Sequence, residues 1–172
     1  MLKPRRAFFS FATSLAAVAL LAGCGFHLRG SQGETVLPFK TMYVSVADTS
    51  SLGAELKRHI RASGDTETVA DAKSAEAILD VLTEAKTEST LTLNSKGQIR
   101  ELALYYTLRF KVRNNAGKEF IPATDITLKR ELSFNEAVVL AKEGEKQLLY
   151  RDMQSDLVQQ VMRRLAAIKP GA

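Results

Sequence analysis

The side chains that most often carry catalysis or hold metals are scarce in this 172-residue sequence. Cys24 is the only cysteine, and the two histidines, His27 and His59, are isolated from each other along the chain. A zinc site needs several nitrogen, sulfur or carboxylate ligands together, and no such cluster lies near His27. The chain also has no Gly-rich phosphate loop, HExxH or GxSxG pattern. We therefore predict no catalytic residues, no metal and no cofactor, with an acid–base site assembled from distant residues as the alternative.

Cys24 closes a segment that has the order of an export signal. Three basic residues between positions 3 and 6 precede an apolar run, Ala7–Ala22, and small residues then lead to the cysteine. The apolar run is shorter than the roughly 20 residues that a membrane-spanning helix needs. Leu21-Ala22-Gly23-Cys24 resembles a bacterial lipobox, which implies cleavage of residues 1–23 and lipid attachment to Cys24. The alternatives are an uncleaved anchor and an ordinary signal peptide.

The expected mature chain has 149 residues and is close to neutral. Three of the 24 basic residues lie in the leader, which leaves 21 basic against 19 acidic residues. This balance argues against a nucleic-acid partner, because non-specific binding depends on many phosphate contacts. Position 25, directly after the lipidated cysteine, is Gly and not the Asp that retains many enteric lipoproteins in the inner membrane. We therefore expect lipid anchoring in the inner leaflet of the outer membrane, on the periplasmic side.

The mature chain is predicted to begin with a tether, a strand and a helix. Residues 24–40 form the lipidated tether, and alternation over residues 41–46 predicts a half-buried strand. The segment Asp48–Ser51 offers N-caps for a helix that ends at Ser63-Gly64. One face of this helix carries apolar residues at i+4 spacing: Leu52, Leu56 and Ile60. Residues 65–74 are polar, and we expect a loop there.

Three further strands are expected next. Residues 75–88 alternate, but their Ala, Glu, Leu and Lys content also allows a helix; we favour a strand because a turn and another strand follow. Residues 104–112 show the clearest alternation, and the third strand passes Pro122, which suits a strand start or a sheet edge. That strand ends near Phe134. Arg130 lies on its apolar side, which predicts either a bulge or a salt bridge.

A long amphipathic helix is predicted at the C-terminus, after a break at Gly144. Its apolar residues repeat every four positions: Leu149, Met153, Leu157, Val161 and Leu165. The order of elements predicts an α+β two-layer sandwich, with two helices packed on one face of a mostly antiparallel four-stranded sheet. We expect one such domain, residues 41–170.

The sheet face opposite the helices is predicted to be polar and basic. Alternation assigns to it Lys86, Arg109, Lys111, Arg113 and Lys129, together with Tyr105. One interpretation is an ordinary solvated surface balanced by Glu84, Glu88 and Glu131. The other is a surface that meets a partner or an anionic lipid headgroup, for which Lys and Arg are suited.

Both ends of the mature chain resemble the LPS-assembly lipoprotein family LptE. The stretch Cys24-Gly25-Phe26-His27-Leu28-Arg29 is similar to the usual mature N-terminus of the family, and residues 135–145 and 149–165 are similar to its last turn and C-terminal helix. The resemblance implies a protein that plugs the β-barrel LptD and helps to deliver lipopolysaccharide (LPS) to the outer leaflet. Basic residues of the family are implicated in LPS contact. The likeness points to Lys142, in an Ala-Lys-x-x-Glu context, and to the turn that carries Lys96, where the charge is shifted by one position.

The resulting hypothesis is a non-enzymatic outer-membrane lipoprotein with the LptD barrel and LPS as partners. Lys142, Lys96 and Arg100 are its candidate LPS-binding residues. A scaffold lipoprotein of another envelope complex, such as a barrel-assembly accessory, is the alternative in another class. An envelope hydrolase is a third possibility and predicts a titratable pair in a pocket.

Overall fold

The fold was obtained as a computed structural model that describes residues 36–47, 49–134 and 138–169. Residues 35–172 form one compact unit. The predicted signal peptide, the lipid attachment at Cys24 and most of the tether lie outside the described residues. Within these residues, no helix is both long enough and apolar enough to span a bilayer.

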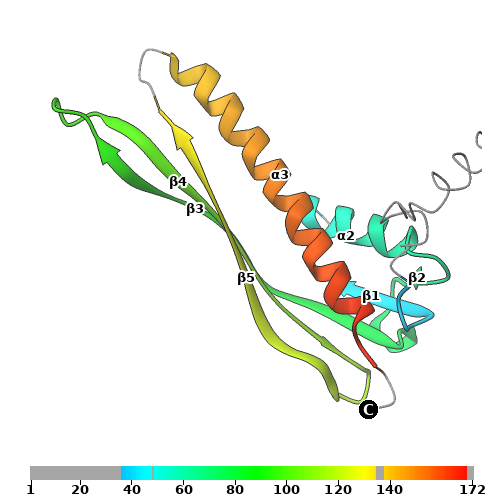
Figure 1. The fold of residues 1–172 in the computed structure, drawn as a ribbon. Helices are drawn as coiled ribbons and strands as arrows, with labels where there is room; N and C mark the ends of the chain where they lie inside the picture. Colours follow the sequence, from blue (N-terminus) through cyan, green and yellow to red (C-terminus); the bar gives the residue numbers. More distant parts are fainter. Residues whose placement is uncertain (1–35, 48, 135–137, 170–172) are drawn as a thin grey trace, which may run out of the picture. The chain divides into compact units, whose positions relative to one another are not determined.

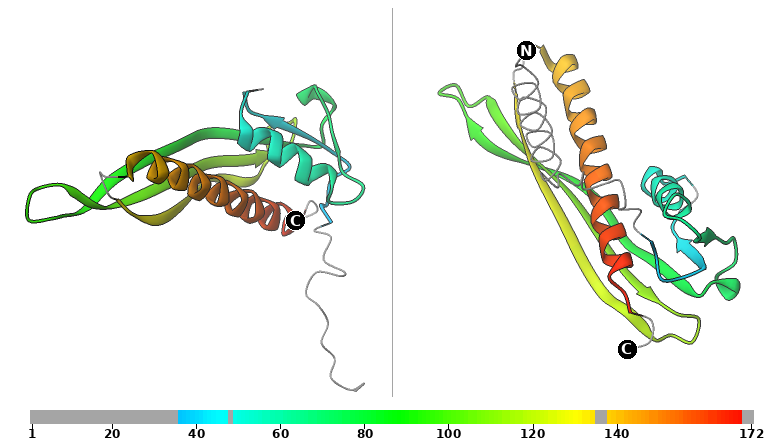
Figure 2. Two further views of the ribbon diagram at one scale, coloured as in Figure 1. Left: turned by 90° about the horizontal axis from the view of Figure 1, so that it is seen from above. Right: turned by 45° about the vertical axis from the view of Figure 1, so that its right-hand side comes forward.

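Five strands form one mixed sheet in the order β2-β1-β3-β4-β5. The elements in chain order are β1 (Thr41–Ser45), α2 (Ser51–Arg61), β2 (Glu67–Thr68), a 3₁₀ turn (Ala72–Ser74), β3 (Ala77–Leu93), β4 (Ile99–Arg113), β5 (Glu119–Ser133) and α3 (Val139–Ala166). β1 pairs in parallel with β2 and β3, whereas β3, β4 and β5 form an antiparallel meander. Both helices lie on the same face of the sheet (Figures 1 and 2). The predicted α+β class is therefore confirmed, with five strands in place of four.

β2 is the strand that the sequence did not predict, since its region was expected to be a loop. It is held to β1 by main-chain hydrogen bonds: Glu67 N donates to Lys40 O at 2.8 Å, and Val69 N donates to Met42 O at 3.0 Å. A strand of two residues contains no alternation that a sequence pattern can reveal. Its pairing depends instead on the position of β1.

α2 begins and ends where the sequence predicts. The Ser50 hydroxyl accepts a hydrogen bond from Gly53 N at 3.0 Å, which caps the first turn. The predicted apolar face is buried against the sheet, and Gly64 follows the helix with a φ of 101°. Gly53 lies so close to β1 that a Cβ atom there would overlap Val46 Cγ1. This position therefore requires glycine for the helix to pack.

α3 is continuous through Gly144, so the predicted break is wrong. The helix has 28 residues and a length of about 42 Å, and it runs along the meander (Figure 1). An internal glycine costs roughly 1 kcal/mol relative to alanine. Ion pairs at i,i+3 spacing lie on both sides of it, Lys142–Glu145 and Glu143–Lys146, each at 2.8 Å. These pairs and the packing of the later turns offset the glycine.

The core lies between the helices and one face of the sheet. Its largest fully buried side chains include Tyr106, Phe110, Leu104 and Leu108 from β4 and Met153 from α3. The helical stripe predicted from the sequence is buried at Met153, Leu157, Val161 and Leu165. Packing of an amphipathic helix on one sheet face is therefore what stabilises this domain.

A β-bulge in β3 inverts the side-chain alternation of that strand. Val81 is opposite Phe110 and Thr83 is opposite Arg109, so Leu82 is an additional residue without an opposite partner. Because successive residues point to opposite faces, one extra residue moves the side chains that follow it to the other face. The parity read from the start of β3 therefore does not hold from Thr83 to Thr90, after which the register shifts again.

The bulge overturns the predicted placement of Lys86, Glu84 and Glu88 on the uncovered face. Lys86 is opposite Tyr106 and lies on the helix side, where its Nζ is 4.8 Å from the Tyr106 ring centroid. Glu88 forms an ion pair with Lys146 of α3 at 2.9 Å. Glu84 accepts a hydrogen bond from the Tyr106 hydroxyl at 2.6 Å.

Arg130 forms a salt bridge, one of the two predicted possibilities. Its Nη2 is 2.7 Å from Asp156 Oδ2 of α3, and the register of β4 and β5 is regular at the Leu104–Arg130 pair. No bulge is present at this point of β5. Pro122 lies near the start of β5, which is an edge strand, as predicted.

Candidate functional site at the hairpin end

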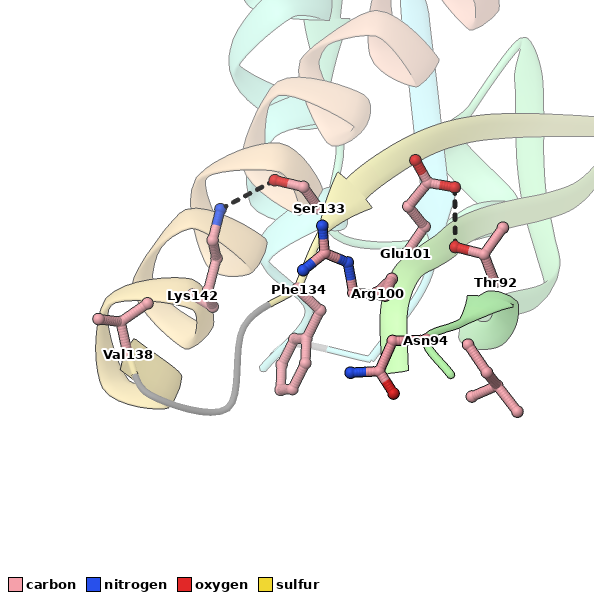
Figure 3. Close-up of a pocket in the computed structure, with 9 residues that line it drawn as sticks. Thr92, Asn94, Arg100, Glu101, Ser133, Phe134, Val138 and Lys142 are labelled. Atoms are coloured by element: carbon pink, nitrogen blue, oxygen red, sulfur yellow. Dashed lines mark hydrogen bonds between the residues drawn. The ribbon is translucent and has the colours of Figure 1, made fainter. Parts of the chain in front are cut away.

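A cavity of about 660 Å³ opens where the β3–β4 hairpin, the end of β5 and the start of α3 meet (Figure 3). Its lining residues are Thr92, Leu93, Asn94, Arg100, Glu101, Ser133, Phe134, Val138 and Lys142. Two of the three candidate LPS-binding residues, Arg100 and Lys142, are therefore brought together, although 42 positions separate them in the sequence. Lys96 does not line the cavity and lies in the adjacent turn.

The turn that carries Lys96 is fixed by Asn94. The Asn94 side-chain oxygen accepts hydrogen bonds from Lys96 N and Gln98 N, both at 2.9 Å. Gly97 supplies the positive φ of 79° that the turn requires. This local network presents Lys96 as an exposed side chain beside the cavity.

Lys142 is positioned by the first turn of α3 and by the end of β5. Its ammonium donates to Glu145 Oε2 at 2.8 Å and to Ser133 Oγ at 3.2 Å. The Lys142 side chain is 19% exposed, whereas that of Glu145 is 49% exposed. Glu145 is therefore a partly solvated counterion. An ion pair of this kind contributes about 1 kcal/mol or less to the stability of the fold.

Arg100 is placed at the start of β4 by the main chain. Phe134 N donates to Arg100 O at 2.7 Å, which joins the two strand ends. The guanidinium forms no ion pair with the residues that the structure describes. Glu101 also lines the cavity and accepts from Thr92 Oγ1 at 3.0 Å, as Figure 3 shows. The cavity thus holds two cations and one carboxylate.

Exposed apolar side chains line part of this cationic cavity. Leu93 and Val138 contribute to it, with exposed fractions of 58% and 46%. Leu91, Val139 and Leu140 are also exposed at this end of the domain but are not among the described lining residues. The sequence analysis does not predict this apolar lining. Its signal is that Val138 falls off the buried stripe of α3 and that Leu93 ends a hairpin strand.

The uncovered face of the sheet is polar but electrically balanced. Each of its four remaining predicted cations is close to a carboxylate: Arg109–Asp125 at 4.0 Å, Lys111–Glu119 at 3.3 Å, Arg113–Asp80 at 2.7 Å and Lys129–Glu131 at 2.8 Å. This arrangement favours the balanced polar surface over the basic surface considered above. The hairpin end, in contrast, brings two cations together with exposed apolar groups.

Three titratable groups elsewhere in the described domain have pKa values that are shifted by burial or by a hydrogen-bond partner. The hydrogen bond from Lys146 lowers the pKa of Glu143 and raises the pKa of Lys146 itself. Burial, followed by the hydrogen bond to Glu84, raises the pKa of Tyr106 well above its usual value. Residues 36–47, 49–134 and 138–169 contain no group of three potential metal-ligating side chains.

Comparison with known proteins matches residues 39–165 to the family described as LptE, lipopolysaccharide-assembly. The LPS-assembly lipoprotein LptE of Pectobacterium atrosepticum is 31% identical over 156 residues, which cover 88% of this chain and 82% of that protein. The homologue from Yersinia enterocolitica, with the same name, is 25% identical and covers 88% of this chain and 72% of its own length.

Solved structures share this architecture. An uncharacterised lipoprotein B from Nitrosomonas europaea has a TM-score of 0.71 and 33% identity, with coverage of 83% of this chain and 91% of that chain. The rare lipoprotein B from Shewanella oneidensis has a TM-score of 0.64 at 22% identity, covering 74% and 94%, and supports the fold alone. With the family match spanning most of its length, this chain belongs to the LptE family of lipopolysaccharide-assembly lipoproteins.

Proposed function

We propose that this chain is an outer-membrane lipoprotein that assists assembly of the LptD β-barrel, plugs it and helps to deliver LPS to the outer leaflet. The observation that carries the proposal is the cavity at the hairpin end, which brings Arg100 and Lys142 together with exposed apolar side chains. The names of its relatives, which describe LPS-assembly lipoproteins, support the same process.

The chemistry of the cavity suits the lipid end of LPS, which combines phosphate groups with acyl chains. The Arg100 guanidinium presents a planar fork of donors that matches phosphate oxygens, and Lys142 supplies a second positive charge. Leu93 and Val138 offer the apolar surface that acyl chains need. Lys96, on the adjoining turn, is the third contact.

Exchange of a counterion explains how Lys142 serves this role. In the unliganded domain its charge is compensated by Glu145, which is partly solvated. A phosphate group placed between Arg100 and Lys142 replaces that carboxylate, and Glu145 returns to water at little cost because exposed pairs are weak. Ser133 remains as a neutral partner that orients the ammonium.

The uncovered face of the meander supports the barrel contact. It carries paired charges and hydroxyls such as Thr107 and Thr127, whose Oγ atoms are 3.1 Å apart. The interiors of membrane β-barrels are polar, so a sheet face that carries these paired charges and hydroxyls is suited to lie against such a wall. Lipid attachment at Cys24 would hold the domain at the periplasmic side of the outer membrane.

LPS binding by the full-length protein tests the cavity assignment. Arg100→Gln and Lys142→Gln should each weaken LPS binding about tenfold or more, because each removes a charge-assisted contact. Arg109→Gln and Lys129→Gln are the matched controls, since they remove the same kinds of cation from the uncovered face, away from the cavity. Equal LPS affinity in all four variants would remove the cavity from the proposal.

Co-purification and lipid labelling test the remaining parts. The wild-type chain, extracted from membranes at native expression, should be recovered with LptD and should incorporate radiolabelled palmitate in a Cys24-dependent manner. Recovery with another envelope complex would favour the alternative, a scaffold lipoprotein such as a barrel-assembly accessory. Recovery of an unlabelled, free periplasmic protein would contradict both.

A further inference from the structure

A second cavity, of about 610 Å³, lies at the opposite end of α3 from the LPS candidate site. It is formed by the start of β5 and the C-terminal turn of α3, which are close together in Figures 1 and 2. Its lining residues are Lys118, Glu119, Phe120, Ile121, Thr124, Arg164, Ala167, Ile168 and Lys169. The two cavities share no residue, so the second needs its own explanation.

Arg164 has an unusual environment within this cavity. Its Nη1 atom is buried and has no hydrogen-bond partner among the residues that the structure describes, although the residue lines the cavity. The guanidinium carbon is 5.9 Å from the centroid of the Phe110 ring. A buried charged donor without a partner is destabilising, and an anion beside it compensates the charge. The hydrogen-bonding capacity of Arg164 is therefore only partly used by the described residues.

The charge of the cavity favours an anion. Among the described residues that line it, three are cations, Lys118, Arg164 and Lys169, and one is a carboxylate, Glu119. That carboxylate is already paired with Lys111 at 3.3 Å. An incoming anion thus meets an excess of positive charge.

The remaining walls are apolar, which a free inorganic ion does not need. Phe120, Ile121 and Ile168 are partly buried against the core and line the same cavity. The Phe120 ring also packs on Phe39, with centroids 5.2 Å apart. Phe39 follows Cys24 by 15 positions, so roughly 50 Å of extended chain at most separates this end from the proposed lipid anchor.

We propose that this second cavity binds the phosphate headgroup of an anionic phospholipid from the leaflet in which the chain is anchored. Arg164 and Lys169 contact the phosphate, and Phe120, Ile121 and Ile168 contact the glycerol and the first methylene groups of the lipid. The assignment of the leaflet rests on the lipid anchor in the proposed function. The binding site itself rests on residues that the LPS candidate site does not contain.

The test is a titration of the full-length protein in zwitterionic detergent with short-chain phosphatidylglycerol. Short-chain phosphatidylcholine and inorganic phosphate are the comparison ligands. The proposal expects phosphatidylglycerol to bind more tightly than either. Arg164→Gln should weaken its binding about fivefold, as expected for one cation at an anionic lipid surface. Equal affinity for inorganic phosphate would show a free-anion site and overturn the lipid assignment.

Arg163→Gln is the matched control, because it removes the same charge from the neighbouring, exposed position of α3, which does not line the cavity. Its affinity for phosphatidylglycerol should equal that of the wild type. Lys169→Gln is a second test variant with an exposed side chain, so loss of folding does not confound it. Equal phosphatidylglycerol affinity in Lys169→Gln and Arg163→Gln would overturn the site. Arg100→Gln should retain phosphatidylglycerol binding, which separates this outcome from failure of the LPS proposal.

Discussion

Replacement of Tyr106 by phenylalanine tests the polar network between the sheet and α3. The Tyr106 side chain is fully buried, and its hydroxyl donates to Glu84 at 2.6 Å. A hydrogen bond to a charged group contributes about 1.5–3 kcal/mol. Glu84 is exposed, so water solvates its carboxylate in the variant and replaces part of the lost hydrogen bond. We therefore expect Tyr106→Phe to lower the free energy of unfolding by about 1.5 kcal/mol at pH 7, at the low end of this range.

The same variant should become less destabilised in alkaline solution. Burial and Glu84 raise the pKa of Tyr106 in the folded protein, whereas an unfolded tyrosine ionises near pH 10. Because the pKa of Tyr106 is higher in the folded state, its contribution to stability is complete below pH 10 and is lost as the pH rises above 10. Loss of this one proton from the unfolded wild type lowers its free energy of unfolding by about 1.4 kcal/mol per pH unit. The free energies of unfolding of the wild type and Tyr106→Phe should therefore be almost equal near pH 11.

Urea denaturation at intervals between pH 8 and pH 11 measures this difference. Leu157→Ala is the control, because it removes a buried group that does not titrate and should cost about 2–5 kcal/mol at every pH. A Tyr106→Phe difference that stays constant up to pH 11 would refute the reasoning. Such a result would mean that the hydroxyl is not held protonated by burial beside Glu84.

Three further predictions concern the helices and use chemical denaturation. Gly144→Ala should raise the free energy of unfolding by about 1 kcal/mol, because α3 is continuous there and a Cβ atom meets open space. A lower free energy of unfolding would instead support the helix break that the sequence predicts at Gly144. Gly53→Ala should destabilise by about 1–3 kcal/mol through overlap with Val46, and Val46→Ala in the same chain should recover most of the loss; no recovery would show that the contact is not the cause. A double-mutant cycle on Arg130 and Asp156 should give a coupling of about 1 kcal/mol or less that decreases with salt, and a coupling insensitive to salt would contradict an exposed ion pair.

Local periodicity was sufficient to predict most of the fold. The apolar stripe from Met153 to Leu165 and the alternation of β4 both describe faces that pack on one core, so their patterns survive in the structure. β3 was correctly assigned as a strand despite its helix-forming composition, because pairing with β4 outweighs propensity. The α+β class followed from the order of these elements.

The predictions that are wrong concern features that depend on contacts with another part of the fold. The bulge at Leu82 is a property of the β3–β4 register, and no local pattern announces it, so Lys86 was placed on the wrong face. β2 is a strand because its main chain pairs with the edge of β1. Glycine disfavours helices, which predicts a break at Gly144, but the ion pairs that span this position form only in the folded helix.

The candidate site was predictable only in part. Resemblance to the family pointed to Lys142 and to the turn of Lys96, but the sequence does not show that Arg100 and Lys142 line one cavity. Their proximity depends on the hairpin, the end of β5 and the start of α3 meeting. The apolar lining at Leu93 and Val138 is not predicted, because exposed apolar residues can be recognised only when the buried face is known.

Photocrosslinking in living cells from a probe at position 93, in the apolar lining of the cavity, tests most directly whether the hairpin end receives LPS. A matched probe replaces Thr127 on the uncovered face of β5. We predict an LPS adduct from position 93 and an adduct with the barrel protein from position 127. Absence of LPS from the position 93 adduct, or equal LPS labelling from both positions, would contradict the claim that the hairpin end receives LPS.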